Sequence, residues 1–445
     1  MKRLLVALAL SATHAVLTAQ TPPPTQATPP QPAPDYNAGG LPRTPSYGTV
    51  TGQPVDARPF EKKADTRQFP QQTRAPYRKA TDYTVTVLNS QVSAGWALAH
   101  LPDGRILLTE RLPGAFRILD KGVLSAPLAG LEALKPTLPM TGLLDVILDP
   151  DFARNRTIYF TWFEYHDRTI ANTSVARAVL DGDRLRDVTV LLKTMPFLPN
   201  DQTLAAGTKT GGRLAFGPDG FLYVVTGDRD NAGNRPWAVA QYNDTHLGKV
   251  LRITRDGAPA PGNPFIGVKG ALPEIWATGL RSPEGLMFDA RGRLWETEHG
   301  PRGGDELNII RKGANYGWPV ISHGIDYRQA PIGDGEVAKA GMEQPVYFWS
   351  PSVAVAGLDF YRGKSKAWAG SVFIGMLNGR GVTRLKLVDD KVVEEEVLLA
   401  DRKLRIRDVR TGPDGSVYVL TDSGGTSISV SPPATGQVIK ITPKN

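Results

Sequence analysis

One short pattern of polar and apolar positions recurs along the chain from about residue 95 to the C-terminus. Each copy has a Pro-Asp-Gly turn or a close relative, followed by a β-rich run that ends in Thr or Gly. The six copies begin at the turns 102–104, 150–152, 218–220, 289–292, 368–370 and 413–415. Asp-Gly and its relatives supply the positive φ that a tight hairpin needs, so each copy predicts a turn that leads into a strand.

A second apolar run precedes most of these turns, as at residues 96–98 and 285–288. A small sheet can bury its faces only against neighbouring sheets, so repeated hairpins predict blades arranged radially. No segment shows a long helical period with caps, which argues against an α/β fold. The sequence therefore predicts an all-β fold, a six-bladed β-propeller with four-stranded antiparallel blades, over residues 78–445. We expect the last strand, residues 437–441, to close the ring by pairing with an early strand such as residues 83–88.

The N-terminus has the pattern of a secretory signal peptide. A charged start at residues 1–3 precedes an apolar run at residues 4–10, and a small residue at a plausible cleavage point is Ala19. The apolar run is too short to span a bilayer. We expect cleavage of residues 1–19 and a periplasmic or secreted protein. The alternative, a buried N-terminal helix, would have nothing to pack on, because a Pro-rich stretch follows at once.

Residues 20–77 are rich in Pro, Gln, Thr and Ala and contain few large apolar residues. Such a composition cannot build a core of its own, so the segment is predicted to be a disordered, extended tether. No other segment approaches the length of a transmembrane helix, which argues against integral membrane association.

Composition excludes several functions. The chain contains no cysteine, so disulfides, thiolate metal sites and cysteine nucleophiles are absent. The formal net charge is +8, but the Lys and Arg residues are scattered and no basic run carries interleaved aromatic residues. This distribution argues against a nucleic-acid partner.

Function in a propeller is expected in the loops around the mouth of the central channel. The segment 298–308 combines glycines and a proline with several carboxylates, and 313–319 is again glycine-rich. Carbonyl and carboxylate oxygens are the ligands that Ca²⁺ prefers, so a hard-cation site is one interpretation. The other is a tight irregular turn with solvated acids, in which His299 is an ordinary structural histidine.

A second candidate is the segment 403–410. Alternation along a strand places Arg405 and Arg407 on one face, and two adjacent guanidinium groups suit a ligand with several carboxylates. The alternative is a pair of exposed arginines bound to Asp401 and Asp408. Two further loops, at 208–214 and 279–285, carry no specific signal when each is considered alone.

Taken in this order, the segments resemble the glucose/sorbosone dehydrogenase family, and within it the bacterial soluble aldose sugar dehydrogenases that depend on pyrroloquinoline quinone (PQQ). The resemblance runs from about Val85 to the C-terminus and is most specific at 300–319 and 405–409. It implies a propeller that holds PQQ across the channel mouth, with Ca²⁺ bound to the quinone. In such enzymes a histidine takes the proton of the anomeric hydroxyl, a hydride passes from C1 of the sugar to C5 of the quinone, and a lactone forms.

The resemblance also implies roles for particular residues. The carbonyls of Gly300 and Pro301 match the ligands of the quinone-bound calcium, and Glu306 and Tyr316 match a calcium-associated pair. The residues matching arginines that hold the quinone are Arg281, Arg405 and Arg407.

On the substrate side, Asp228 matches an aspartate that orients the catalytic histidine, and Tyr327 matches a tyrosine that faces the sugar. We expect a small-molecule sugar as substrate and a diffusible or membrane electron acceptor as partner.

Five positions depart from the family pattern. Lys209 stands where the catalytic histidine is expected, and Met140 where a glutamine would contact the sugar. In the quinone site Ser282 replaces an asparagine, Glu284 a glutamine and Asn378 a lysine. A glutamate gained and a lysine lost near a polyanionic cofactor weaken its electrostatic binding.

The function expected from these residues is PQQ-dependent oxidation of aldoses at the C1 hydroxyl, with Lys209 or a water as the base. A lysine acts as a base only when it is neutral, and a neighbouring carboxylate favours its charged form. Loss of a general base costs about 10² to 10⁴ in rate. The alternative is therefore a non-catalytic, calcium-stabilised propeller that binds a carbohydrate or another ligand. A lactonase or other hydrolase rests on fold analogy alone.

Overall fold

The computed structural model describes part of the unit Gly40–Asn445 of the chain. The described residues are 45–111, 114–134, 142–165, 170–196, 198–199, 209–229, 238–422 and 435–444. Among them, no helix has the length and apolar character needed to cross a membrane.

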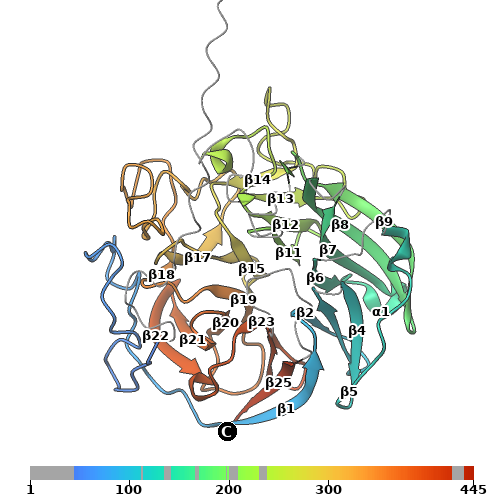
Figure 1. The fold of residues 1–445 in the computed structure, drawn as a ribbon, viewed down its shortest axis with the longest axis horizontal. Coiled ribbons are helices and arrows are strands. Elements are labelled where there is room, and N and C mark those ends of the chain that lie inside the picture. Colours follow the sequence, from blue (N-terminus) through green and yellow to red (C-terminus); the bar gives the residue numbers. More distant parts are fainter. Residues whose placement is uncertain are drawn as a thin grey trace, which may run out of the picture. The chain divides into compact units, whose positions relative to one another are not determined.

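The described residues form six antiparallel sheets that lie around a central axis as the blades of a propeller (Figure 1). Blade 1 contains β2 (Gly95–His100), β3 (Ile106–Glu110), β4 (Ala115–Asp120) and β5 (Val123–Leu124). Blade 2 contains β6 (Leu143–Leu148), β7 (Thr157–Tyr165) and β8 (Ile170–Asp181), and the outer edge of β8 pairs with both β9 (Arg184–Lys193) and β10 (Leu198–Pro199). Blade 3 contains β11 (Gly211–Phe216), β12 (Leu222–Thr226), β13 (Lys249–Ile253) and β14 (Ile275–Thr278).

The other three blades complete the ring. Blade 4 contains β15 (Pro283–Phe288), β16 (Leu294–Glu298), β17 (Asp305–Ile310) and β18 (Tyr347–Trp349). Blade 5 contains β19 (Val355–Phe360), β20 (Ser371–Met376), β21 (Gly381–Val388) and β22 (Lys391–Leu398). Blade 6 contains β23 (Ile406–Thr411), β24 (Val417–Thr421), β25 (Gly436–Pro443) and β1 (Tyr83–Val92). The predicted six-bladed propeller is confirmed.

Short helices occur only between strands in the described residues. They are η1 (Leu131–Leu134), α1 (Phe152–Asn155), η3 (Val239–Gln241) and η4 (Ala400–Arg402).

All six predicted turns lie between the first and second strands of a blade. Gly104, Gly220 and Gly415 have φ values of 88°, 78° and 78°, which an L residue with a side chain adopts only under strain. The second copy has no glycine, and α1 makes the connection instead; Arg156, which caps its C-terminus, has a φ of 57°. The repeated turn therefore has the same place in every blade.

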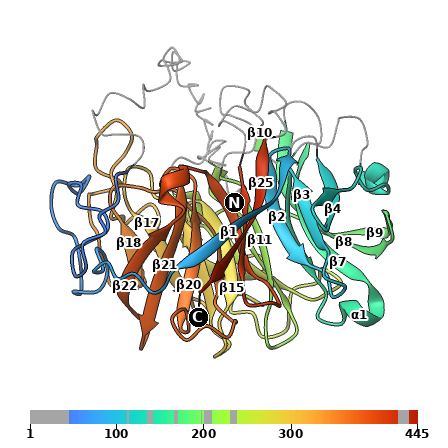
Figure 2. The ribbon, with the colours of Figure 1, turned by 90° about the horizontal axis from the view of Figure 1, so that it is seen from below.

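The ring closes through the two ends of the propeller sequence. Strand β1 pairs antiparallel with β25, with Tyr83 opposite Pro443, Val85 opposite Ile441 and Val87 opposite Ile439. Figure 2 shows the two strands side by side. The closure predicted from the sequence is confirmed, and it makes the first strand of the chain the outermost strand of the last blade.

The core consists of separate layers between neighbouring blades. Trp96, Phe116 and Leu143 belong to a cluster that joins blades 1 and 2. An equivalent layer between blades 4 and 5 includes Trp295 and Val355. Because each sheet buries its faces against the next sheet, the blades stabilise one another around the whole ring.

A buried ion network joins the inner strands of blades 2, 3 and 6. Arg213 on β11 lies 3.2 Å from Asp145 on β6 and 3.0 Å from Asp408 on β23, and none of the three side chains is more than 1% exposed. The Arg213 guanidinium also donates to the carbonyls of Glu284 at 2.7 Å and Arg407 at 3.0 Å. This arginine therefore connects the strands that surround the channel.

We expect Arg213→Met to destabilise the protein by about 3–5 kcal/mol, because it leaves Asp145 and Asp408 with reduced compensation in the interior. Calorimetric unfolding measures the loss. The matched control is Arg105→Met, which removes an ion pair to Asp103 at a partly exposed blade turn and should cost about 1 kcal/mol or less. Equal losses in the two variants would contradict a structural role for the network.

The structure differs from the predicted tether over residues 45–77, which we call the strap. The strap lies along blades 4 and 5 (Figures 1 and 2), and its residues Val55 and Ala75 are 2% and 3% exposed. The Phe348 N–H of β18 donates to the Gln72 carbonyl at 2.8 Å. A segment that cannot build its own core can still pack on a formed one, which composition does not reveal. Residues 1–44, including the predicted signal peptide, lie outside the described residues.

Candidate functional site

Lys209 and Asp228 meet at one end of blade 3. Lys209 lies just before β11, Asp228 follows β12, and the Lys209 Nζ is 3.5 Å from the Asp228 Oδ1. The indole Nε1 of Trp318 donates to the Asp228 Oδ2 at 2.7 Å. The side chains of Lys209 and Asp228 are 14% and 6% exposed. The structure thus places the lysine beside a carboxylate that is held by a second hydrogen bond, and its role as a base stays a prediction.

A glycine allows this close approach. A Cβ added to Gly227 would lie 1.9 Å from the Lys209 carbonyl oxygen, so only a glycine fits there without a backbone shift. Lys209 itself has a φ of 46°, in the left-handed region that side chains rarely adopt. The close packing therefore fixes the Lys209 backbone next to the segment that carries Asp228.

Arg281 connects this pair to the loop that follows β16. Its guanidinium donates to the carbonyls of His299 at 2.7 Å and Gly300 at 2.9 Å. Its backbone carbonyl accepts a hydrogen bond from the Asp228 N–H at 2.9 Å. Ser282, the next residue, accepts the His299 N–H through its carbonyl at 3.0 Å. The carbonyl of Gly300, predicted to bind calcium, therefore already accepts a hydrogen bond from a cation.

The loop 299–305 is folded tightly around Asp305, whose role the sequence analysis missed. The Asp305 Oδ1 accepts the Gly300 N–H at 2.9 Å, and its Oδ2 accepts the N–H groups of Val353 at 2.8 Å and Ala354 at 2.6 Å. Asp305 is fully buried. The interpretation of this segment as a turn with solvated acids is wrong, because its central acid is an internal anchor between blades 4 and 5.

Blade 4 carries further acids on one face, of which Glu296 and Glu298 are buried and Glu306 is half-buried. Glu298 lies opposite Glu306, and Glu296 opposite Asn308, in the register of β16 and β17. Burial raises the pKa of Glu298 to about 7. Burial and the neighbouring Glu298 raise the pKa of Glu296 and of Glu306 well above the usual range. The face therefore concentrates carboxyl groups that are costly to ionise without a cation.

Two oxygens of this face, the Glu296 Oε1 and the Asn308 Oδ1, are buried without a hydrogen-bond partner. Hard oxygen donors of this kind fit Ca²⁺. In the described part of the chain, however, no three His, Asp or Glu side chains are grouped to hold a metal. Main-chain carbonyls would have to complete a calcium site. Tyr316 would contribute its main-chain carbonyl to such a site, because its hydroxyl already donates to the Ile309 carbonyl at 2.6 Å.

Arg407 is buried and lies between two carboxylates. Its guanidinium is 2.9 Å from Glu284 and 2.8 Å from Asp422. The alternative prediction, in which the arginines are exposed and bound to Asp401 and Asp408, is wrong for Arg407. Asp408 binds Arg213 and Arg410 instead. Glu284, one of the departures from the family pattern, is thus held in place by the arginine beside it.

Arg405 is less fully paired. Its side chain is 28% exposed and lies 3.9 Å from Asp422, and it donates to the Leu377 carbonyl at 3.3 Å. Its Nε is buried without a hydrogen-bond partner. Burial lowers the pKa of Arg405, Asp422 opposes this shift, and the like charges of Arg407, Arg380 and Arg111 add to it. Arg405 therefore shares the Asp422 carboxylate with Arg407, which lies nearer to it at 2.8 Å.

Arg380 and Arg111 were missed in the sequence analysis. Arg380 follows Asn378 by two residues in the connection between β20 and β21, and its Nε is also buried without a partner. The sequence did contain a signal for Arg380, because it is a basic residue two positions after Asn378, where the family has a lysine. Asn378 itself donates its N–H to the Val353 carbonyl at 3.0 Å.

The structure does not test the two residues predicted to contact the sugar, Tyr327 and Met140. Tyr327 lies in a loop between β17 and β18 and is 40% exposed. Met140 lies outside the described residues. The roles of both stay predictions.

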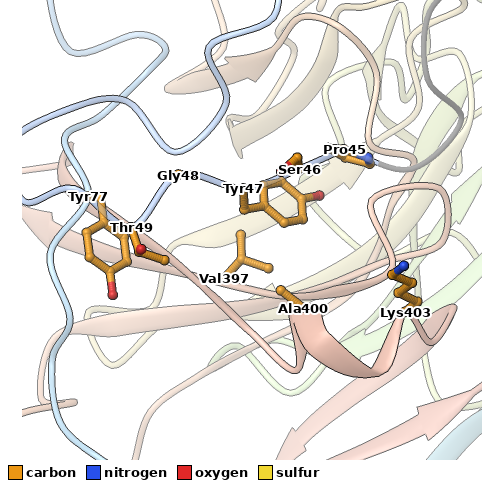
Figure 3. A pocket seen from close by; sticks show the side chains of 9 residues that line it. All are labelled: Pro45, Ser46, Tyr47, Gly48, Thr49, Tyr77, Val397, Ala400 and Lys403. Carbon is orange, nitrogen blue, oxygen red and sulfur yellow. The ribbon is translucent and has the colours of Figure 1, made fainter.

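A cavity of about 310 Å³ lies between the strap and blade 5 (Figure 3). Its lining includes Tyr47, Tyr77, Val397 and Lys403. None of the residues predicted to bind the quinone, the metal or the sugar lines it, so we do not assign it to the reaction.

The chain is similar to known proteins over most of its length. Residues 92–430 match the family model for glucose/sorbosone dehydrogenase. The aldose sugar dehydrogenase of Escherichia coli is 40% identical over 368 residues, which cover 81% of this chain and 93% of that protein.

Solved structures show the same likeness. The apo form of the soluble aldose sugar dehydrogenase from Escherichia coli aligns with a TM-score of 0.72 and 38% identity, over 82% of this chain and 100% of that one. The PQQ-bound form of aldose sugar dehydrogenase from Streptomyces coelicolor aligns with a TM-score of 0.63 and 26% identity, over 82% and 99% of the two chains. The match over most of the propeller, together with the fold, shows that this chain belongs to the glucose/sorbosone dehydrogenase family.

Proposed function

We propose that the protein oxidises aldose sugars at the C1 hydroxyl, with PQQ as the hydride acceptor and Ca²⁺ as its metal. The observation that carries the proposal is the surplus of guanidinium groups around Arg405. Arg405 and Arg407 both face the Asp422 carboxylate, at 3.9 Å and 2.8 Å, and the buried Nε atoms of Arg405 and Arg380 lack a hydrogen-bond partner. A ligand with several carboxylates would supply the missing anions, and PQQ is such a ligand.

PQQ supplies a hydride acceptor and calcium a Lewis acid when they are bound. Arg405 and Arg380 would bind carboxylate groups of the quinone, while Arg407 is mostly engaged by Glu284 and Asp422. The carbonyls of Gly300 and Pro301 would contact the metal at the quinone.

At the sugar, Lys209 would stand beside the C1 hydroxyl and Asp228 would fix its orientation. In its charged form Lys209 donates a hydrogen bond to a sugar oxygen, and a water then takes the hydroxyl proton. In its neutral form the Lys209 Nζ takes that proton directly. The Lys209 Nζ lies 3.5 Å from the Asp228 Oδ1, so the carboxylate competes with the sugar hydroxyl for the amine, which supports a slow reaction.

The proposal is tested with a dye-linked assay on the calcium- and PQQ-loaded protein and a panel of aldoses. We expect lactone formation from at least one aldose, dependent on added PQQ. Absence of turnover with every aldose, in a protein shown to bind PQQ, would favour the second candidate function. That candidate is a non-catalytic propeller that binds a carbohydrate, and the observation in its favour is Lys209 in place of the expected histidine.

We expect Glu284→Gln to raise the affinity for PQQ about 3- to 10-fold, because Glu284 competes with the quinone for Arg407 at 2.9 Å. Titration followed by the absorbance of PQQ measures the change. The control Glu336→Gln removes an equal charge from an exposed pair with Lys339. An unchanged or lower affinity of the Glu284 variant would show that this carboxylate does not oppose cofactor binding.

We also propose that the protein is exported to the periplasm or the medium and that a diffusible or membrane acceptor reoxidises the quinone. The charged start and short apolar run of residues 1–19 support export. Mass spectrometry of the mature protein tests this directly, and an N-terminus at Gln20 is expected. An intact Met1 would contradict it.

A further inference from the structure

The middle of the strap contacts two loops of blade 4. The first loop, residues 299–305, contains the carbonyls predicted to bind calcium. The second loop, residues 321–335, contains Tyr327, which is predicted to face the sugar. Residues 61–66 of the strap touch both loops with polar side chains.

Glu61 holds the first loop. Its carboxylate lies 2.9 Å from the Arg302 guanidinium, and the two side chains are only 9% and 20% exposed. The Glu61 N–H donates to the Ser350 Oγ at 3.1 Å. A Cβ added to Gly303 would lie 3.3 Å from the Glu61 Cβ, so the strap is also packed against this loop. An ion pair this sheltered is screened less by solvent than a surface pair.

Lys62 and Thr66 hold the second loop. The Lys62 Nζ donates to the carbonyls of Ser322 at 3.1 Å and Gly335 at 2.8 Å, which closes the base of the loop. The Thr66 Oγ1 lies 2.9 Å from the Nδ1 of His323. The His323 ring stacks on Phe348 with 4.0 Å between the ring centroids. The strap therefore contacts the loop at both ends of the segment 322–335.

The two loops are joined to each other through their main chains. Arg302 and Ile325 exchange a pair of N–H to carbonyl hydrogen bonds, each of 3.0 Å. A Cβ added to Gly324 would lie 2.2 Å from the Gly303 carbonyl oxygen. Pro301 directly precedes Arg302, and Tyr327 follows Ile325 by two residues. We call the paired residues Arg302 and Ile325 the joint of the two loops. A displacement of the joint would move the predicted metal ligands and the predicted sugar contact together.

We propose that Glu61, Lys62 and Thr66 are positioning residues, through which the strap fixes the joint of the two loops and thereby sets calcium affinity and sugar binding. The strap lies outside residues 92–430, which match the family model. The effect on calcium and sugar rests on the proposed function, whereas the effect on the joint does not.

The first test is hydrogen exchange of the apoprotein, followed by mass spectrometry of peptides that cover residues 300–305 and 322–327. We expect about tenfold faster exchange in Glu61→Gln and in Lys62→Met, because local opening becomes easier when the joint is not held. The control Asp65→Asn breaks the pair with Arg67, which lies within the strap and is 38% exposed on both sides. Lys62→Arg keeps the donors and should retain protection. Equal exchange in all variants would overturn the proposal.

The second test measures calcium affinity by calorimetry and sugar oxidation by the dye assay. Glu61→Gln should weaken calcium binding about 3- to 10-fold and raise KM for the sugar more than it lowers kcat, while Asp65→Asn stays at the wild-type values. Faster exchange with unchanged calcium affinity and KM would overturn the link to the site. If the wild-type protein binds no calcium, the calcium assignment fails, and the exchange data still decide whether the strap holds the joint.

Discussion

Lys209→His is expected to raise kcat for aldose oxidation by about 10²-fold or more, because it restores a general base beside Asp228. The Lys209 Nζ lies 3.5 Å from the Asp228 Oδ1, so the side chain at this position is directed toward the carboxylate that would orient an imidazole. Trp318 holds the other Asp228 oxygen at 2.7 Å and keeps the carboxylate in place. The dye-linked assay at saturating PQQ measures the gain.

Two controls separate base catalysis from other effects of this substitution. Lys209→Gln removes the charge without adding a base, and its kcat should stay far below that of the histidine variant. PQQ titration should give the same affinity for both variants, because Lys209 pairs with Asp228 and is not one of the residues assigned to the quinone. A histidine variant that binds PQQ normally but is no faster than wild type would contradict the role assigned to position 209.

Arg405→Gln is expected to lower the affinity for PQQ by about 10- to 100-fold, since it removes a charged donor from the carboxylate-binding site. The folded protein should tolerate this change. Arg405 is 28% exposed and lies 3.9 Å from Asp422. Its loss leaves no carboxylate unpaired, because Asp422 keeps its closer contact with Arg407 at 2.8 Å. Arg407 is unsuitable for the same test, because its removal would leave Glu284 and Asp422 unpaired in the interior.

The matched control is Lys403→Gln, which removes a positive charge two residues earlier on an exposed side chain. Its PQQ affinity should equal that of the wild type, and the melting temperatures of both variants should remain close to it. An Arg405 variant with unchanged affinity would mean that the surplus of guanidinium groups does not bind the quinone.

The fold was predictable because its determinants are local. Each blade begins with a hairpin whose turn residues have a specific conformational role, as Gly104 and Gly415 illustrate with their positive φ values. The strap was not predictable, because its partners lie far away in the sequence. Its main chain pairs with β18 and β22, and the Glu395 N–H, for example, donates to the Pro76 carbonyl at 3.0 Å.

The candidate site was predictable in part. The resemblance pointed to Lys209 and Asp228, whose side chains lie 3.5 Å apart. The partners of Arg407, by contrast, depend on how three segments meet in space. The buried acids of β16 and β17 were hidden because cross-strand register is a tertiary property. Glu296 and Glu298, two positions apart in a strand, nevertheless share one face by alternation, and this local signal was available.

The most direct measurement is a titration of the calcium-loaded apoprotein with PQQ, followed through the absorbance of the cofactor, with subsequent addition of aldoses and a dye acceptor. We expect stoichiometric binding and reduction of the dye that depends on the sugar. No binding at micromolar PQQ would contradict the assignment of the Arg405 cluster as a quinone site and leave the propeller with a different ligand.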